Sequence, residues 1–528
     1  MAAGTTTYRA GAAAAIHAAL APDGFTFADP EHVELVVLDT FDGRLASAGL
    51  RLVACRRTDV AHDGFDLTLA RRAGADAGAH THAGTLPRSA DDVPAGPLRG
   101  RLAALAGARV LLPLLTVTAA HSRGSRRNAD EKLIAAVDVH GGVAVTTGPG
   151  AGVEAAAVPG AFAAVTELAG YAGAAASARE ALAAADLDRL AGAVTMLDVA
   201  AATAGVDLAG TAITPGVPLE VDEPAIGAFR VVLANLHDAI VANLDGTVTD
   251  VDSEFLHDVR VAVRRTRAVL ANAKRVIPAA VLAPARDEFG RLGRLTGTAR
   301  DLDVHQLEWA NYVAGMAPAA IADLEPVREH LDIERVVAHD LLAVELRGDR
   351  TRRLLEWWSG WLEGPPDTTD LPPAAARPIG RYISKRISRA HDTMIERGRA
   401  IGPATPAEQL HALRKDAKRL RYLIECFGGL AKPAARRGFV TKLKALQENL
   451  GEHQDAEVHA ATLRAVATEL DHGASSAPPA TTLAIGQLVE RMEQRGRRSR
   501  EEFAGRFADF DSSATRKALA ALLAGVRR

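Results

Sequence analysis

The spacing of apolar residues changes partway along the chain. Between residues 33 and 147, short runs alternate apolar and polar positions and are separated by glycine and aspartate. Such alternation is typical of strands with one buried face, so we expect an antiparallel sheet or barrel here. After Pro224, apolar residues recur every three or four positions, which is the period of an amphipathic helix. The pattern therefore predicts an α+β protein, in which an antiparallel β-barrel-like domain precedes an all-α domain.

The predicted elements follow from these two periods. Strands are expected at 33–40, 50–58, 64–72, 109–123 and 132–147. Helices are expected at 227–244, 253–276, 280–299, 300–317, 319–347 and 350–363, then at 376–400, 405–428, 432–450, 453–472, 480–508 and 512–526. Proline-rich segments at 205–225 and 363–373 are typical of linkers. We therefore expect domains at 1–205 and 226–528, a linker at 206–225, and helical repeats at 226–363 and 374–528.

The two helical sets are related by one offset. Residues 255–270 and 409–424 read FLHDVRVAVRRTRAVL and QLHALRKDAKRLRYLI, and a shift of 154 positions aligns them. The same shift aligns three pairs of histidines: His237 with His391, His257 with His411, and His305 with His459. A constant offset across separate helices indicates an internal duplication, because unrelated segments would need gaps. We expect two helical bundles related by a pseudo-twofold axis.

Each aligned segment combines an apolar face with a basic face. At about 100° per residue, four basic residues of the first segment fall within an arc of about 80°: His257, Arg260, Arg264 and Arg267. Apolar residues occupy the neighbouring arc and are expected in the core: Leu256, Val259, Val263 and Leu270, with Leu410, Leu413, Ala417 and Ile424 in the second segment. A row of cations of this kind suits a long anion. The competing interpretation is a solvated helix surface, which the duplication and the shortage of acids four residues away disfavour.

Further basic residues flank these segments. Arg381, Lys385 and Arg389 recur at intervals of four and share one helix face. Arg291 and Arg294 share a face in the first set, and Lys442 flanks the expected surface in the second. The net charge is −3, but residues 255–300 hold 10 Lys and Arg against three acids, and residues 377–444 hold 17 against five. Local clusters, rather than net charge, attract an anionic ligand.

The sequence carries no strong signal for disulfides, metal binding or a membrane. Cys55 and Cys426 lie in different halves, which is neither a disulfide framework nor a zinc-site pattern. By inspection, no run of 18 or more residues is apolar enough to span a bilayer. We therefore expect a cytoplasmic protein with no membrane association, no bound metal and no cofactor.

The β-type region has a specific resemblance. Residues 32–57 read HVELVVLDTFDGRLASAGLRLVACRR, in which a strand ends at Asp39-Thr40 and a turn follows at 48–51. This order resembles the CYTH family of triphosphate tunnel metalloenzymes, and the resemblance covers roughly residues 1–205. In that family, basic residues hold a triphosphate and acidic residues hold Mg²⁺ or Mn²⁺.

The acidic residues that mark the family are missing. The first 30 residues contain neither Glu nor Lys, so the Glu-x-Glu-x-Lys motif of the first strand is absent. Glu154 stands alone where a second Glu-x-Glu pair belongs. We therefore expect a catalytically degenerate domain that supports the helical half.

An active tunnel is the alternative. A metal-dependent triphosphatase or polyphosphatase would need substitutes for the missing acids, for which the candidates are His62, His80, His82, Asp91 and Asp92. Three arginines of one predicted strand either line such a tunnel or alternate outward as strand charges: Arg51, Arg56 and Arg57.

The helical half has its own resemblance. The duplicated segment is followed by LTGTARDLDVH at 295–305 and by LGEHQDAEVH at 450–459. Together these motifs resemble the CHAD family, a conserved-histidine α-helical domain, over roughly residues 220–528. Members of the family bind inorganic polyphosphate and are often fused behind CYTH domains.

The resemblance assigns polyphosphate binding to the basic faces. The residues implied are His257, Arg260, Arg264, Arg265 and Arg267 in the first copy, and His411, Arg414, Lys415, Lys418, Arg419 and Arg421 in the second. We add the flanking residues Arg291, Arg294, Arg381, Lys385, Arg389 and Lys442. Arginine gives bidentate contacts to phosphate and lysine gives a mobile point charge. Four acids are expected to position these side chains by ion pairs: Asp301, Asp303, Asp455 and Glu457.

The expected function is binding without catalysis. We expect polyphosphate in a groove between the bundles, and association with polyphosphate granules and their proteins. A nucleic-acid ligand ranks last, because no recognition-helix motif or interleaved aromatic residues accompany the basic faces. Trp309, Trp357, Trp358 and Trp361 are expected to pack between helices.

Overall fold

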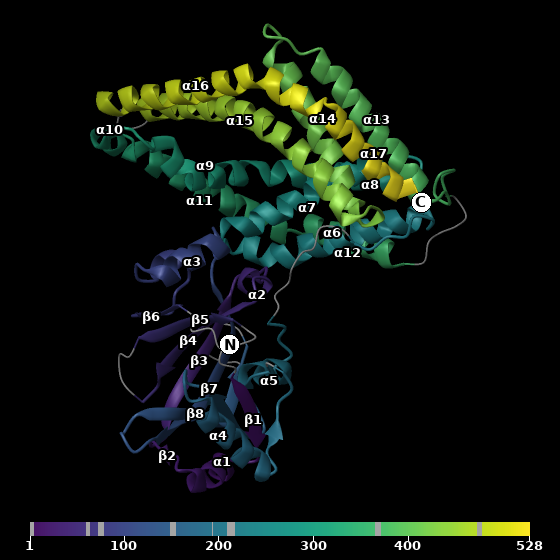
Figure 1. Ribbon diagram of the computed structural model, residues 1–528. Coiled ribbons are helices and arrows are strands. Elements are labelled where there is room, and N and C mark those ends of the chain that lie inside the picture. The colour runs from purple at the N-terminus through teal and green to yellow at the C-terminus, as the bar shows by residue number, and fades with distance from the viewer. Residues whose placement is uncertain are drawn as a thin grey trace. The chain divides into compact units, whose positions relative to one another are not determined.

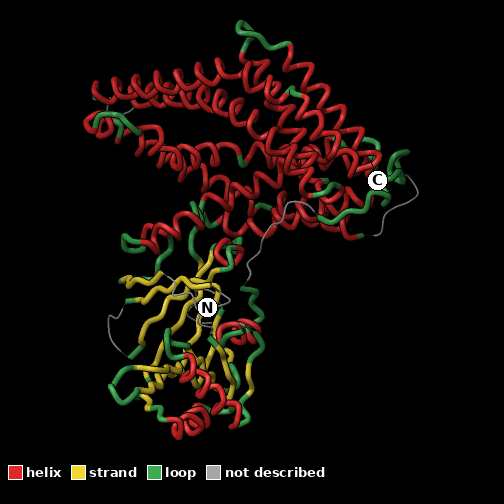
Figure 2. Tube along the Cα trace, in the orientation of Figure 1, coloured by secondary structure: helices red, strands yellow, loops and turns green. Residues whose placement is uncertain are grey.

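The computed structural model describes residues 5–59, 64–71, 79–147, 155–192, 194–208, 217–364, 371–472 and 478–527. The chain divides into two compact units, a β-rich unit, Met1–Ile213, and a helical unit, Thr214–Arg528. Figures 1 and 2 show strands in the first unit and helices throughout the second. The prediction of an antiparallel β region followed by an all-helical region is confirmed.

Eleven strands among the described residues form one antiparallel sheet in the β-rich unit. Their order is β11-β1-β10-β8-β7-β3-β4-β5-β6, with β2 paired to β7 and β9 paired to β8. The strands are β1 (Thr6–Ala10), β2 (Thr26–Phe27), β3 (Glu31–Asp39), β4 (Leu50–Arg57), β5 (Phe65–Arg71), β6 (Ala79–Ala83), β7 (Leu112–Arg127), β8 (Leu133–Thr146), β9 (Ala156–Ala157), β10 (Ala161–Thr166) and β11 (Asp188–Arg189). Each of the predicted strand ranges overlaps one of them: β3, β4, β5, β7 or β8.

Helices cover both faces of this sheet. They are α1 (Ala13–Leu20), α2 (Arg44–Ser47), α3 (Pro97–Ala106), α4 (Ala172–Ala184) and α5 (Met196–Thr203). Because successive side chains of a strand point to opposite faces, β3 contributes to two cores. Val33 and Val37 pack with Met196 of α5, whereas Val36 packs with Leu102 of α3. A third core lies where α1 and α4 pack on β8 and β10.

The helical unit is built from long helices. They are α6 (Ala225–Val248), α7 (Ser253–Ala271), α8 (Ala279–Leu295), α9 (Gly297–Val313), α10 (Pro318–Asp323), α11 (Glu325–Arg347), α12 (Asp349–Glu363), α13 (Ile379–Arg399), α14 (Ala407–Cys426), α15 (Pro433–His472), α16 (Pro479–Phe510) and α17 (Ser513–Arg527). The predicted core residues of the aligned segments are all buried: Leu256, Val259, Val263 and Leu270 on α7, and Leu410, Leu413, Ala417 and Ile424 on α14. The helical periodicity therefore identified the inner face of both helices correctly.

Reciprocal hydrogen bonds relate the two repeats. The backbone N–H of Ala225 donates to the carbonyl of Arg377 at 2.9 Å, and the N–H of Ile379 donates to the carbonyl of Glu223 at 3.0 Å. A shift of 154 carries 225 to 379 and 223 to 377, so the two bonds are equivalent, with the repeats exchanging roles. In a twofold interface, when residue i of one copy contacts residue j of the other, residue j of the first copy also contacts residue i of the second. The repeats are therefore related by a pseudo-twofold axis.

One predicted helix boundary is wrong in the second repeat. The predicted helices at 432–450 and 453–472 are a single helix, α15. In the first repeat, the corresponding break lies at Thr296, whose hydroxyl donates to the carbonyl of Leu292 at 2.8 Å. A hydroxyl bonded four residues back bends a helix. Leu450 occupies the equivalent position of α15 and has no such group, and the helix continues through it.

A second boundary differs in the first repeat. The predicted helix at 319–347 is divided at Leu324 into α10 and α11. Pro326 lies at the second residue of α11. Proline is favoured in the first turn because the N–H that it lacks has no partner within the helix there. The proline therefore starts a new helix rather than continuing the old one.

α6 is long and apolar enough to cross a membrane, a property that inspection of the sequence missed. An 18-residue window of this helix has a mean hydropathy of 1.4, and 56% of the window is buried inside the protein. Phe229 of α6 is fully buried and lies 5.0 Å from Phe427, measured between ring centroids. These contacts are those of a core helix of the helical unit.

Candidate functional site

The two aligned helices, α7 and α14, pack against each other. Arg265 of α7 donates to Glu425 of α14 at 3.0 Å. The guanidinium of Arg264 lies over the ring of Tyr422, 5.8 Å from its centroid. Arg419, the equivalent of Arg265, in turn lines a pocket with the end of α7. The basic faces of the two repeats therefore meet beside the pseudo-twofold axis.

Equivalent cations face each other at this junction. Lys418 corresponds to Arg264 under the shift of 154. Burial lowers the pKa of Lys418 to about 8, and the neighbouring Arg414, Arg264 and Arg421 lower it as well. Burial likewise lowers the pKa of Arg260, whereas the negative charge of Asp301 raises it. We call Arg260, Arg264, Arg414, Lys418 and Arg421 the axial cluster.

The members of the axial cluster differ in how far their charge is compensated. Arg414 donates to Asp455 at 2.9 Å, and Arg421 lies 3.6 Å from Glu425. Among the described residues, Arg264 and Lys418 form no ion pair with a carboxylate. The axial cluster is thus a partly desolvated site with an excess of positive charge. Such a site is costly when empty and is stabilised by an anion.

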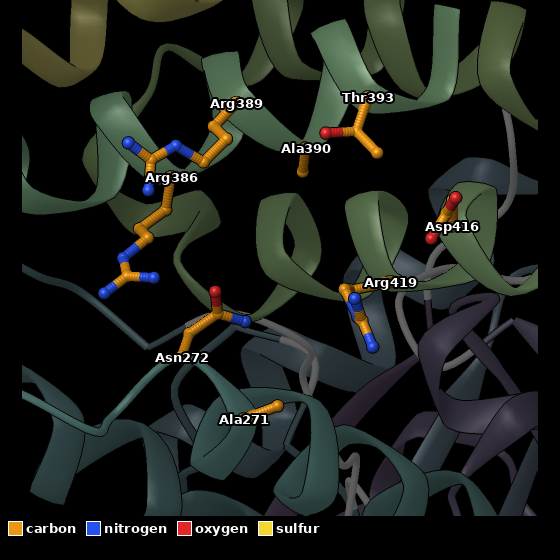
Figure 3. A pocket seen from close by; sticks show the side chains of 8 residues that line it. All are labelled: Ala271, Asn272, Arg386, Arg389, Ala390, Thr393, Asp416 and Arg419. Carbon is orange, nitrogen blue, oxygen red and sulfur yellow. The ribbon is translucent and has the colours of Figure 1, made fainter. Parts of the chain in front are cut away.

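A first pocket beside the axial cluster lies between α13 and α14. It has a volume of about 260 Å³. Its lining residues are Ala271, Asn272, Arg386, Arg389, Ala390, Thr393, Asp416 and Arg419. Figure 3 shows Arg386, Arg389 and Arg419 around this space. Asp416 is engaged by Arg397 at 3.1 Å, which leaves the pocket with a net positive lining.

A second pocket lies where α7, α8 and α12 contribute side chains. Its volume is about 490 Å³, and its lining residues are Arg267, Arg286, Asp287, Gly290, Arg291, Arg294 and Arg350. Arg291 donates to Glu288 at 2.9 Å and to Thr351 at 3.2 Å, so its charge is partly compensated. Arg267 and Arg294 are exposed and form no ion pair among the described residues. The predicted residues Arg267, Arg291 and Arg294 therefore share one basic pocket.

Other predicted residues lie apart from these groups. Arg381, Lys385 and Lys415 are exposed, and Lys442 is half-buried on α15. No described contact joins any of them to the axial cluster. His257 and His411, the two histidines predicted to bind polyphosphate, are half-buried. The ring of His411 forms a hydrogen bond with the side-chain amide of Gln454.

The histidines at the end of the motif lie on the axis itself. The rings of His305 and His459, which are equivalent under the shift, have centroids 4.8 Å apart. Tyr312 contributes a hydroxyl 3.0 Å from Nδ1 of His459. Burial lowers the pKa of His305 to about 4, and His459 acts in the same direction. This pair therefore stays neutral near pH 7 and packs the repeats together.

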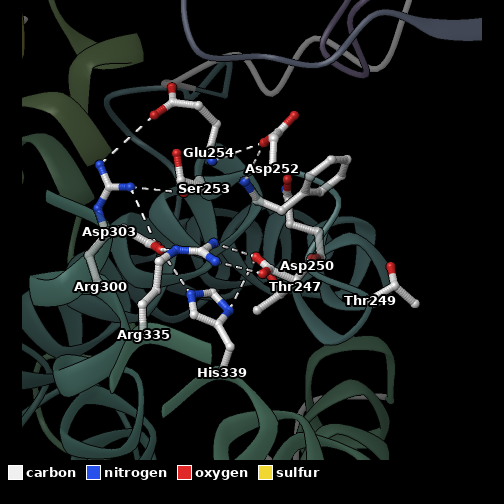
Figure 4. A network of polar contacts seen from close by, with 12 residues as sticks. Thr247, Thr249, Asp250, Asp252, Ser253, Glu254, Arg300, Asp303, Arg335 and His339 are labelled. Atoms are coloured by element: carbon white, nitrogen blue, oxygen red, sulfur yellow. Dashed lines mark hydrogen bonds and ion pairs between the residues drawn. The ribbon is translucent and has the colours of Figure 1, made fainter. Parts of the chain in front are cut away.

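The four predicted positioning acids have different partners. Asp455 holds Arg414, as expected, and Asp301 acts electrostatically on Arg260. Asp303 does not hold a predicted binding residue, because it lies in a buried network with other cations (Figure 4). Its carboxylate accepts from Arg335 at 2.8 Å and contacts His339 at 2.9 Å. Glu457 is exposed, 3.8 Å from His453.

Several site residues were missed because the repeat offset did not flag them. Arg300 acts electrostatically on Arg260, yet its equivalent in the second repeat is Gln454. Arg386 lines the first pocket, yet its equivalent is Val232. Arg286 and Arg350 complete the second pocket from α8 and α12. A search for basic residues outside the repeated motif would have found them.

The predicted tunnel arginines of the β-rich unit are all ion-paired. The pairs are Arg51 with Asp198, Arg56 with Glu34 at 3.0 Å, and Arg57 with Glu31 at 3.4 Å. The side chain of Arg51 is 10% exposed, whereas those of Arg56 and Arg57 are 40% and 44% exposed. Arg56 and Arg57 therefore point outward as strand charges, whereas the ion pair of Arg51 links β4 to α5.

The proposed substitutes for the missing acids do not converge. His80 lies 3.1 Å from Thr68, and His82 lies 3.1 Å from Asp66. Asp91 pairs with Arg99, and Asp92 caps a turn at Ser89. His62 and Glu154 lie outside the described residues. Within the described part of the chain, no three His, Cys, Asp or Glu side chains gather into a metal-binding group.

One polar group of the sheet was not predicted. Nε2 of His121 lies 3.1 Å from Oδ1 of Asp138, and the rings of His121 and His140 are 4.9 Å apart. Burial lowers the pKa of His140 to about 4, and His121 lowers it as well. These residues are brought together by the register of β7 and β8. The register of the two strands could not be predicted from the sequence alone.

The comparison with known families bears on the helical unit. Residues 231–464 match the family model of the CHAD domain. The helical unit contains a CHAD domain. The sheet of the β-rich unit fits the CYTH-like tunnel that its sequence resembles.

Solved structures and curated relatives were also found. The CHAD domain from the plant Ricinus communis is 25% identical, with a TM-score of 0.43, over 58% of this chain and 95% of that chain. PptA from Streptomyces chartreusis is 17% identical, with a TM-score of 0.40, over 54% of this chain and 99% of that chain. Two Mycobacterium tuberculosis relatives, the uncharacterized proteins MT2285 and Rv2226, are each 28% identical over 283 residues. That alignment covers 52% of this chain and 52% of each relative, so the chain spans about half the length of the curated relatives it matches.

Proposed function

We propose that the CHAD domain binds linear inorganic polyphosphate without hydrolysing it. The axial cluster and the two flanking pockets together form the proposed site. The observation that carries the proposal is the meeting of Arg264 and Lys418, two equivalent cations without a carboxylate partner in the described structure. The resemblance to a polyphosphate-related family supplies the identity of the anion.

The arrangement suits a chain of repeated charges. Polyphosphate has about one negative charge per unit and no bases to recognise, so it needs cations spread along a path rather than a specific pocket. Arg267 takes part in the second pocket, and Arg419 takes part in the first. Both lie on helices that also carry the axial cluster. A flexible anion that contacts both pockets would therefore also neutralise the cations between them.

The lining disfavours a single-stranded nucleic acid. Base stacking needs exposed aromatic side chains. Tyr422, the aromatic residue beside Arg264, is 6% exposed, and Trp358 is fully buried. The exposed Trp357 lies on α12 and lines neither of the two described pockets. Phosphate is therefore the group that this surface is equipped to hold.

The proposal extends to the place of action. A protein that binds polyphosphate through a surface site is expected to associate with polyphosphate granules in the cytoplasm. Fluorescently tagged full-length protein should co-localise with polyphosphate stain. The Arg264→Ala/Lys418→Ala variant should spread through the cell.

The direct test is a titration of the full-length chain with polyphosphate, orthophosphate and single-stranded DNA. We expect polyphosphate to displace DNA at a much lower concentration of phosphate groups, and affinity to fall steeply with salt. Displacement of polyphosphate by DNA at a lower concentration of phosphate groups would overturn the proposal. Release of phosphate from the bound chain with Mg²⁺ or Mn²⁺ would instead support the triphosphatase alternative.

Binding is also expected to depend on pH in a defined window. The free site holds the pKa of Lys418 at about 8, and a bound polyanion favours its ammonium form and raises that pKa. Binding above pH 8 must then take up a proton, so affinity should decline as pH rises from about 8 to about 10. Calorimetry in buffers of different ionisation enthalpy measures this uptake. Lys418→Arg keeps the charge at every pH, so this variant should lose the dependence.

A further inference from the structure

α11 carries an apolar stripe on its outer face. Ile333, Val336, Val337, Leu341 and Val344 are each between 50% and 69% exposed. Their spacing places them on one side of the helix over three turns. Exposed Asp340 shares this side of the helix with them. Several exposed apolar side chains on one side of a helix indicate an interaction site, whereas a single exposed one does not. We call these five residues the α11 stripe.

The opposite face of α11 is buried, and it combines a polar network with four apolar side chains: Val327, Leu331, Leu342 and Leu346. Arg335 donates to Asp250 at 2.7 and 2.9 Å and to Asp303 at 2.8 Å. His339 is 5% exposed and contacts Asp303 at 2.9 Å. Figure 4 shows this network joining α11 to α9 and to the turn before α7. Rolling the helix to hide the stripe would break these ion pairs, so the stripe is fixed outward.

The second repeat provides an internal comparison. The shift of 154 aligns the start of α11 with the start of α16. The five stripe positions correspond to polar residues on α16: Gln487, Glu490, Arg491, Arg495 and Arg498. Arg335 corresponds to Val489, which is buried. At these five positions the outer face of the helix is therefore polar in the second repeat and apolar in the first.

We propose that the α11 stripe is the contact surface of a homodimer in which α11 packs antiparallel against α11 of a second copy. Two charged residues beside the stripe indicate that its partner is a second copy of the chain. Exposed Glu329 and Arg347 are 18 residues apart, which is five full turns, so they lie on one side of the stripe. Their midpoint, residue 338, is also the centre of the stripe. An antiparallel pairing about this point places Arg347 of each copy beside Glu329 of the other.

The other unit of the chain is a poorer partner. Within its described residues, the β-rich unit exposes one large apolar side chain, Val194. An apolar stripe is best covered by another apolar stripe, and a twofold dimer provides one by pairing a surface with itself. The five side chains from each copy make a contact at the small end of specific interfaces, so a reversible dimer is expected.

The test is the mass of the full-length chain in solution. From about 1 to about 100 μM, the range that reveals a micromolar Kd, light scattering should rise from 55.3 kDa toward twice that value. Leu341→Arg/Val344→Arg installs the residues of the second repeat and should keep the chain monomeric. The matched control, Leu483→Arg at a 71% exposed site on α16, should dimerise like the parent chain. Circular dichroism of each variant checks that the helices are retained.

Charge exchange tests the antiparallel register. Glu329→Arg and Arg347→Glu should each weaken dimerisation, and the double variant should restore it. A parent chain that stays at monomer mass throughout, or a stripe variant that dimerises normally, would overturn the proposal. Failure of the double variant to recover would exclude the antiparallel pairing.

Discussion

Replacing Arg264 and Lys418 together by glutamate is expected to lower the affinity for polyphosphate by at least about a hundredfold. Each side chain offers charge-assisted hydrogen bonds to phosphate, worth about 1.5–3 kcal/mol apiece. The replacements also place carboxylates where the repeats bring their basic faces together, so the loss of attraction becomes repulsion. Calorimetric or polarisation titration of the full-length variant measures the effect.

The control for this variant reverses the same types of charge elsewhere. Arg506→Glu/Lys517→Glu exchanges one arginine and one lysine on α16 and α17, and neither residue lines either of the two described pockets. Its net charge equals that of the site variant. Affinity should fall by less than about tenfold if the site is local, since exposed distant charges are screened. Equal losses in the two variants would mean that overall charge, rather than the axial cluster, holds the ligand.

The Asp303→Asn variant is expected to lose about 3 kcal/mol of unfolding free energy in the helical unit. Asp303 is fully buried and accepts from Arg335, with His339 and Arg300 nearby. Removing its charge leaves Arg335 and His339 with Asp250 as their remaining carboxylate contact, so part of the desolvation cost of these side chains is no longer offset. The thermal midpoint of the helical unit should fall by roughly 5–10 °C. Scanning calorimetry of the full-length chain follows this transition.

Asp301→Asn is the matched control for this stability effect. Asp301 lies two residues away on the same helix but is exposed, so its replacement should change the midpoint by no more than about 2 °C. The Asp303 variant should keep its polyphosphate affinity if the network is structural. A midpoint unchanged by Asp303→Asn would show that the network contributes little to stability.

Much of the helical unit was predictable because its signals are local. The period of α7 identified its buried residues, and a repeated motif does not depend on knowing the fold. The paired histidines at the offset of 154 led to the expectation of a pseudo-twofold axis, which the reciprocal bonds of Ala225 and Ile379 bear out. Boundaries were less predictable. The helix breaks near Thr296 in the first repeat and continues through Leu450 in the second, a difference that a pattern of apolar residues does not record.

The partners of charged residues were the least predictable part. Asp303 looked like a support for the basic faces, but its carboxylate is taken by Arg335 and His339, which lie 32 and 36 residues later. Arg51 was expected either to line a tunnel or to point outward as a strand charge, but it pairs with Asp198 of α5. An ion pair is decided by which side chains the fold places within a few ångströms, and distance along the chain says little about that.

The sequence by itself determined the α+β order, the duplication, and the basic and apolar faces of α7 and α14, because each depends on residue spacing within a short segment. Only the tertiary structure decided that Arg264 and Lys418 lie close together with no ion pair to a carboxylate among the described residues, and that the α11 stripe faces outward. Both are consequences of how helices far apart in the chain pack. Burial and the choice of counter-ion arise from that packing, and no single segment contains them.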